Sequence, residues 1–283
     1  MTLLPIRMVD KPWGRDALPA PFVAPADQRI GEVWFEPPAE LNQLLVKYIF
    51  TSEKLSVQVH PSDAQTTEAG LGKQGKEECW LVIDADEGAS LGIGFDKPIT
   101  ARKMRVAATD GTIEPLMTWF PVTAGDFFYI PAGTVHAIGA GVSLIEVQQN
   151  SDITYRLYDY GRPRELHLDA GMAVALGASY DRALTQNVGP VGPAALVDGP
   201  HFRLDRVDGG PAPDVAARYA GPLLVIPLDG SARIAGETVR GGECACAPSL
   251  SEVTFTGRSL IAQPCQAGSV ASIQPPPTTR SPA

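Results

Sequence analysis

The stretch FFYIPAGTVHAIG, residues 127–139, decides the fold of this chain. An apolar and aromatic run enters a Pro-Ala-Gly turn, and His136 follows among further apolar residues. Pro131 and Gly133 are residues that turn a chain. We therefore predict that His136 begins a new strand and points into a small barrel, where rigid strands suit a metal ligand. A packed core histidine is the competing interpretation of this residue taken alone.

Two further segments place polar side chains on apolar strands. In LSVQVHPSDA (55–64), side chains alternate between faces, so Gln58 and His60 share one face and the neighbouring valines share the other. In GKEECWLVID (75–84), the same alternation puts Lys76, Glu78 and Trp80 on one face, whereas Cys79 points away. A Gln/His pair opposite two valines is not the pattern of a plain core strand.

These segments together predict a metal site. His60, Glu78 and His136 form a common catalytic zinc set that leaves a position open for water or substrate, and Gln58 could add an oxygen ligand. The same two histidines and carboxylate match the iron(II) site of oxygenases. The donor types alone do not decide between zinc and iron.

The remaining pattern predicts a mainly β protein of two small barrels. Among 283 residues, 28 are glycine and 26 are proline, as short strands joined by many turns require. The predicted strands of the first part are 44–50, 54–60, 78–85, 126–132, 135–141 and 142–149, and those of the second part lie near 202–207, 223–229, 231–237 and 252–257.

We divide the chain into a catalytic domain at 1–180, a Gly/Pro linker at 181–195, a second small β-barrel domain at 196–268 and a disordered tail at 269–283. The sequence of residues 163–180 predicts a helix that ends at a Gly-Ala-Ser segment.

The composition also limits the cellular location and the binding partners that we expect for this chain. The formal net charge is −9 without a basic stripe, which argues against nucleic acid and means that an anionic substrate would need local positive groups. From the residues given, we expect neither a signal peptide nor a membrane-spanning segment. The four cysteines have no zinc-ribbon or disulfide spacing, so we expect a reduced cytoplasmic protein. Whether the chain is a monomer or a homodimer stays open.

The spacing Gly125-x5-Pro131-x-Gly133-x2-His136 resembles the second signature motif of the cupin barrels. Further motifs make residues 8–180 similar to the class I mannose-6-phosphate isomerases in their short bacterial form. They are DKPWG (10–14), GEVWF (31–35), LSVQVHPSDA, GKEECWLVID, IPAGTVHAIG (130–139) and EVQQNSDITYRLYDYGR (146–162). The resemblance implies two cupin-type jelly-roll barrels and a zinc-dependent isomerase of a sugar phosphate.

The resemblance also implies roles for individual residues. The zinc ligands, one ion per chain, fall on His60, Glu78 and His136, with Gln58 at a further ligand position. The implied reaction interconverts mannose 6-phosphate and fructose 6-phosphate through an enediol, and zinc would stabilise the enediolate.

An active-site arginine matches Arg156, which stays protonated and so suits an electrophilic rather than a basic role. A lysine that contacts substrate falls on Lys76, and an acidic pair on Glu146 and Asp152. The base stays open between Lys76, Glu146 and a zinc-bound hydroxide. Lys76, Arg162 and Arg164 are candidates for holding phosphate.

Two other functions remain open at this stage. An iron(II)-dependent cupin oxygenase could use the same three ligands. A non-enzymatic regulator that binds a sugar phosphate could have kept the pocket, although a pure binder need not keep a metal site and an arginine together.

Overall fold

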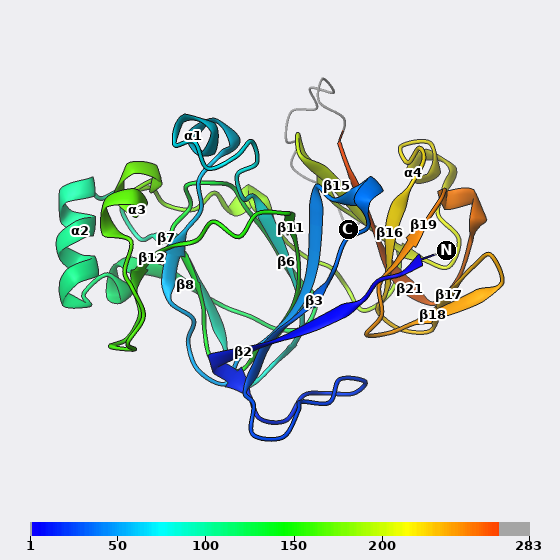
Figure 1. Cartoon of the computed structure of the whole chain (residues 1–283), viewed down its shortest axis with the longest axis horizontal. Helices are drawn as coiled ribbons and strands as arrows, with labels where there is room; N and C mark the ends of the chain where they lie inside the picture. The colour runs from blue at the N-terminus through cyan, green and yellow to red at the C-terminus, as the bar shows by residue number, and fades with distance from the viewer. Residues whose placement is uncertain (1, 266–283) are drawn as a thin grey trace, which may run out of the picture.

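The computed structural model describes residues 2–265. The predicted disordered tail at 269–283 lies outside these residues. The chain is mainly β, with strands that form two barrels placed side by side (Figure 1). Both the fold class and the two-barrel architecture predicted from the sequence are confirmed. None of the helices within residues 2–265 has the length and apolar character needed to cross a membrane.

The first barrel consists of two sheets. In spatial order, the seven-stranded sheet contains β13 (Thr185–Asn187), β9 (Asp126–Ile130), β6 (Glu78–Ala85), β11 (Val142–Gln149), β4 (Leu44–Phe50), β3 (Ile30–Phe35) and β2 (Ile6–Arg15). The five-stranded sheet contains β12 (Tyr155–Tyr158), β5 (Val57–Val59), β10 (His136–Ile138), β7 (Ser90–Phe95) and β8 (Met117–Pro121). Side chains such as Trp80 and Ile93 fill the space between the two sheets.

The second barrel packs a six-stranded sheet against a three-stranded one. The larger sheet contains β1 (Thr2–Leu3), β19 (Ala245–Ala247), β16 (Leu223–Pro227), β21 (Arg258–Pro264), β15 (Phe202–Asp208) and β14 (Ala194–Asp198). The smaller contains β18 (Glu237–Arg240), β17 (Ser231–Ile234) and β20 (Val253–Thr256). Val225 and Phe255 belong to the apolar core between them.

Helices cover the ends and the outer side of the first barrel (Figure 1). They are α1 (Asp63–Glu68), α2 (Ala101–Asp110) and α3 (Leu168–Val174), with α4 (Pro213–Ala216) on the second barrel and 3-10 turns at Ala39–Leu41, Glu114–Leu116, Arg182–Leu184 and Leu250–Glu252. Met104 of α2 and Val174 of α3 pack on Val57 and Val59 of β5. Within the segment 163–180, for which a helix was predicted, only the seven residues of α3 are helical.

For the strands at 44–50, 78–85 and 142–149, the bounds predicted from the sequence are the same as those in the structure. The sequence did not predict β2 or α2. β2 mixes charged and apolar residues without a regular period, because its first half is an exposed edge of the sheet and only its end is buried.

The two barrels share an apolar interface. The outer face of the seven-stranded sheet, with Tyr48 and Leu81, packs against the six-stranded sheet, with Leu224 and Leu260. Two short strands cross the predicted domain division. β1 joins the second barrel by pairing with β19, and β13 adds residues of the predicted linker to the first barrel by pairing with β9. The division itself stays a prediction.

Candidate active site

The turn that precedes His136 has the conformation its residues predict. Gly133 has a φ of +82°, a region that favours glycine. A Cβ there would lie 3.0 Å from the backbone oxygen of Val174. The Gly133 N–H donates to the backbone carbonyl of His60 at 2.8 Å. The turn therefore fixes both the start of β10 and its position beside His60.

Three neighbouring strands of the five-stranded sheet align polar side chains in one row. Gln58 of β5 lies opposite His136 of β10 on one side and opposite Arg156 of β12 on the other. Residues paired in this way present side chains to the same face. The predicted facing of Gln58 and His60 agrees with this arrangement, because Val57 and Val59 pack on the helices outside.

The opposite sheet supplies Glu78 and a second polar row. Trp80 of β6, Glu146 of β11, Lys47 of β4 and Trp34 of β3 are cross-strand partners in that order. The alternation predicted for β6 is borne out, because Trp80 packs inside the barrel whereas Cys79 belongs to the interface between the barrels.

His60, Glu78 and His136 meet in the interior of the first barrel. One potential ligand atom from each lies within 4.8 Å of the others, and all three side chains are buried. The Nε2 atoms of His60 and His136 lie 3.5 and 3.3 Å from Oε2 and Oε1 of Glu78. Gln58 Nε2 lies 3.3 Å from His136 Nε2. The structure thus brings together all four residues predicted from the sequence as metal ligands.

Hydrogen bonds orient both imidazoles toward Glu78. Nδ1 of His60 lies 2.9 Å from the Ile153 carbonyl, and Nδ1 of His136 lies 2.9 Å from the Thr134 carbonyl. A carbonyl only accepts, so each Nδ1 carries the proton and each Nε2 keeps its lone pair. This is the arrangement typical of metal-binding histidines.

Burial favours neutral imidazoles here. Desolvation, together with the charge of Lys76, lowers the pKa of His136 to about 4 and the pKa of His60 well below its ordinary value. Desolvation and the charge of Glu146 raise the pKa of Glu78. The two imidazoles are therefore neutral and keep their Nε2 lone pairs, as metal binding requires.

A divalent cation fits these residues. Glu78 Oε1 is buried and has no hydrogen-bond partner within residues 2–265. The Lys76 ammonium satisfies only the other oxygen, Oε2, at 2.5 Å, and it also lies 3.0 Å from His60 Nε2. Two neutral imidazoles and a carboxylate with an unsatisfied oxygen suit zinc or iron(II).

A cavity of about 330 Å³ is lined by Gln58 and Lys76, which contact the two histidines of this cluster. Its charged lining comprises five cationic side chains, Lys11, Lys47, Lys76, Arg156 and Arg164, and three acidic ones, Glu32, Glu146 and Asp152. Positive groups are therefore in excess here, although the chain as a whole carries −9. Such a lining attracts an anionic substrate.

Glu146 lies at the centre of the buried polar row. Its Oε1 accepts from the Lys47 ammonium at 3.0 Å and its Oε2 from the Trp80 indole at 3.0 Å. Burial alone would raise the pKa of this carboxyl, but Lys47 and Lys76 lower it below its ordinary value. Glu146 is therefore held as a carboxylate.

The arginines predicted from the sequence have different positions. Arg156 lines the cavity, donates through Nη1 to the Glu165 carbonyl at 2.7 Å, and has a buried Nε without a partner among the described residues. Arg164 lines the cavity and binds both oxygens of Asp159. Arg162 pairs with Glu53 and Asp159 and is not among the lining residues.

Lys47 was not predicted from the sequence. It is buried within the apolar strand LLVKYIF, and its ammonium also lies 4.6 Å from the centre of the Trp34 ring. A lysine inside an otherwise apolar strand was the available signal, since a buried charge requires a partner.

Comparisons with known proteins agree with this site and fold. The chain is 39% identical over 201 residues to "Mannose-6-phosphate isomerase" of Streptococcus mutans. The aligned region covers 68% of this chain and 62% of that protein. It is 43% identical over 137 residues to "Mannose-6-phosphate isomerase ManA" of Bacillus subtilis, covering 46% of this chain and 43% of that protein. The chain thus matches only part of these relatives' length. No family model matches it.

Solved structures share the fold over nearly the whole chain. The mannose 6-phosphate isomerase from Bacillus subtilis has a TM-score of 0.71 at 23% identity and covers 93% of this chain and 99% of its own. A point mutant of phosphomannose isomerase from Salmonella typhimurium has a TM-score of 0.69 at 14% identity, with coverage of 93% and 99%. The resemblance inferred from the motifs is therefore confirmed.

Proposed function

We propose that this chain, a relative of the mannose-6-phosphate isomerases that shares their fold, is itself a zinc-dependent isomerase that interconverts mannose 6-phosphate and fructose 6-phosphate. One observation carries the proposal. A buried His60–Glu78–His136 cluster is in contact with Gln58 and Lys76, and these two residues line a cavity whose charged lining is predominantly positive. The cluster fits a metal and the lining fits a phosphorylated substrate.

His60, Glu78 and His136 would hold the zinc ion. Gln58 would add its amide oxygen, since rotation of the amide exchanges the two terminal atoms, and Nε2 already lies 3.3 Å from His136 Nε2. When bound, zinc acts as a Lewis acid toward the oxygens on which negative charge develops.

Arg156 would stabilise the same developing charge. Its side chain reaches the cavity from the strand next to Gln58, and its Nε is buried without a partner within residues 2–265. A guanidinium remains protonated, so it can donate to the enediolate but cannot remove a proton. Preorganised donors of this kind are worth about 3–4 kcal/mol in the transition state.

Lys76 is the residue that we propose for moving the proton between C2 and C1, as a base in its neutral amine form and as an acid in the ammonium form that contacts Glu78 here. It is buried at the base of the cavity and touches both His60 and Glu78. Glu146 suits this role less well, because Lys47, Lys76 and Trp80 lower its pKa and a carboxylate so stabilised is a weak base. We assign Glu146 the role of holding Lys47 and Trp80 in place.

Arg164 and Lys11 are the phosphate-binding candidates at the rim of the cavity. Asp159 fixes the Arg164 guanidinium through two hydrogen bonds, and Glu32 lies 3.2 Å from the Lys11 ammonium. Each cation is thus held by a carboxylate before substrate arrives. Arg162, which lies outside the lining, is no longer a candidate.

The other candidate functions have no observation in their favour. An iron(II) oxygenase would need the same three ligands, but the curated relatives carry the name of an isomerase. A regulator that only binds sugar phosphate would have no use for a buried metal cluster.

Conversion of mannose 6-phosphate to fructose 6-phosphate by the purified chain, followed in a coupled assay, tests the proposal. We expect turnover that is abolished in Glu78→Gln, with zinc as the metal found in the active protein. Oxygen consumption, or iron in an active preparation, would favour the oxygenase instead. Binding of mannose 6-phosphate without turnover would favour the regulator.

A further inference from the structure

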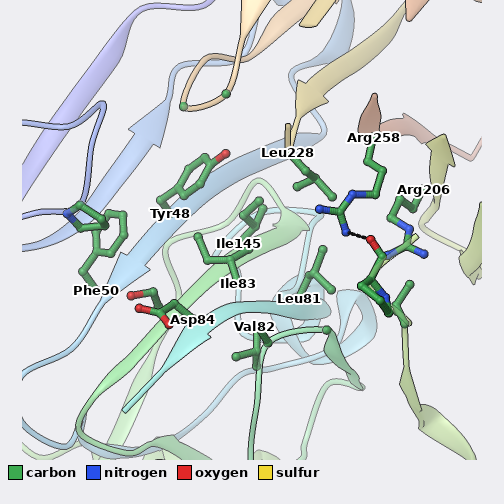
Figure 2. A pocket seen from close by; sticks show the side chains of 18 of the residues that line it. Tyr48, Phe50, Leu81, Val82, Ile83, Asp84, Ile145, Arg206, Leu228 and Arg258 are labelled. Carbon is green, nitrogen blue, oxygen red and sulfur yellow. Dashed lines mark hydrogen bonds between the residues drawn. The ribbon is translucent and has the colours of Figure 1, made fainter. Parts of the chain in front are cut away.

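A second and larger cavity, of about 580 Å³, lies between the two barrels (Figure 2), and neither His60, Glu78 nor His136 lines it. One wall is the outer face of the seven-stranded sheet, where Tyr48 and Phe50 of β4, Leu81 of β6 and Ile145 of β11 are exposed to the cavity. Leu228 belongs to the opposite wall, in the second barrel. Both the volume and the apolar wall are typical of sites that bind small molecules.

One end of this cavity carries a buried positive charge. Arg206 is only 4% exposed, and its Nη1 and Nη2 donate to the carbonyls of Gly189 and Val191 at 2.7 and 3.0 Å. Its Nε has no hydrogen-bond partner, and no carboxylate lies within ion-pair distance of Arg206 among residues 2–265. A buried guanidinium normally has an anionic partner, so this end of the cavity lacks one.

The other charged groups do not remove this excess. Arg258 lies beside Arg206 in Figure 2, but Asp229 neutralises it through an ion pair of 2.5 Å. Asp84 lines the cavity at the side away from the two arginines (Figure 2), and it is exposed. Asp208 and Asp229 act on the Arg206 charge from a longer distance, but among residues 2–265 no carboxylate forms an ion pair with it.

A second polar group in the cavity wall also lacks a partner. The Ser143 hydroxyl is fully buried, lines the cavity, and makes no hydrogen bond within the described part of the chain. Ser143 lies opposite Phe50 and Asp84 in the sheet. A buried hydroxyl without a partner costs about 1–3 kcal/mol, and a polar ligand atom would satisfy it.

We propose that this cavity binds a small amphipathic organic anion. Its apolar body would lie against Tyr48, Leu81 and Ile145, and its carboxylate would accept from Arg206. An apolar wall with one charged end selects this class over a sugar phosphate, which has no apolar part to bury. The inference goes beyond the proposed isomerase activity and does not depend on it.

The position of this site relates it to the metal cluster. Side chains alternate along β4, β6 and β11, so Lys47, Trp80 and Glu146 point into the first barrel whereas their neighbours Tyr48, Leu81 and Ile145 point into the cavity. A ligand in the cavity would therefore contact the same three strands that hold the polar row of the active site.

Isothermal titration of the full chain with octanoate tests the proposal. We expect saturable binding to one site, with affinity about tenfold lower in Arg206→Gln, since a charged hydrogen bond is worth about 1.4 kcal/mol. Neutral 1-octanol should bind about tenfold less tightly than octanoate. Arg233→Gln, which removes an exposed arginine of the same barrel outside the cavity, should leave octanoate binding unchanged.

A cavity-filling variant provides a second test that does not alter charge. Ile83 is half-buried in the cavity wall, and Ile83→Trp should abolish octanoate binding while circular dichroism and thermal melting report a folded chain. The proposal is overturned if the wild type does not bind octanoate, if octanol binds equally well, or if Arg206→Gln and Ile83→Trp both bind octanoate as the wild type does.

Discussion

Lys47 and Glu146 are direct neighbours across β4 and β11, and their side chains form an ion pair of 3.0 Å inside the first barrel. The Lys47 side chain is 7% exposed and that of Glu146 is 4% exposed. Burial disfavours the charged form of each residue, and each relieves that cost for the other. The pair links β11 to β4, which lie between β6, the strand that carries Glu78 and Trp80, and β3, the strand that carries Trp34.

We predict that Lys47→Met destabilises the chain by about 3 kcal/mol, because it leaves the Glu146 carboxylate buried without its principal partner. The free energy of unfolding from urea titration measures this effect. Lys54→Met is the control, since Lys54 forms a more exposed ion pair with Glu114 and should change stability by less than about 1 kcal/mol. If the two variants lose the same free energy of unfolding, the buried pair contributes no more to stability than the exposed one.

Glu78→Gln should abolish zinc binding and turnover. A change in a group that merely hydrogen-bonds to a metal ligand costs about 10–100-fold in metal affinity, so loss of a ligand should cost more. The adjacent residue provides a matched control, because Glu77 faces away from the cluster and contacts Tyr129 and His201. Metal analysis should find zinc in Glu77→Gln and not in Glu78→Gln. Full zinc content in both variants would contradict the proposed ligand set.

Arg156→Ala should lower kcat by about 10²–10³-fold without changing the zinc content, because it removes a donor to the enediolate and not a metal ligand. Steady-state kinetics with metal analysis of the same preparations would check this. Arg162→Ala, which removes an arginine outside the cavity lining, should keep kcat near the wild-type value. An Arg156→Ala variant with normal turnover would exclude the proposed role.

His201 should make stability depend on pH. Its Nε2 lies 3.5 Å from Glu77 and its Nδ1 lies 3.6 Å from Asp63, so it connects the second barrel to the first. The hydrogen bond with Glu77 raises the pKa of His201 above its ordinary value. A raised pKa in the folded state stabilises the chain below the unfolded pKa of about 6.5 and ceases to do so as pH rises through the folded value.

Wild type and His201→Gln should therefore differ most in thermal stability near pH 5.5 and least near pH about 8.5. Melting curves of both proteins across this range test the prediction. A difference that is constant with pH, or that grows toward high pH, would show that the protonated imidazole is not what stabilises this contact.

The positions of Gln58, His60 and Glu78 could be predicted because side-chain alternation along a strand depends only on local sequence. Where polar residues interrupt apolar strands, the period of two identifies the face they share. The turn before His136 was equally local, since Gly133 adopts a positive φ.

Lys47 and His201 could not be assigned in this way. Which face of LLVKYIF is internal depends on its pairing with β3 and β11, which a single sequence does not specify. His201 lies half-buried against Glu77, and a single sequence does not indicate this contact because it joins residues more than a hundred positions apart. The cavity between the barrels depends in the same way on how two separate sheets pack.

The central claim is that the His60–Glu78–His136 cluster holds zinc and that the chain isomerises mannose 6-phosphate. Fructose 6-phosphate formation by the purified chain, measured before chelation, after chelation and after zinc is restored, tests it most directly. We expect turnover that disappears with chelation and returns with zinc. Turnover that survives complete removal of metal, or no turnover in the zinc-loaded chain, would contradict it.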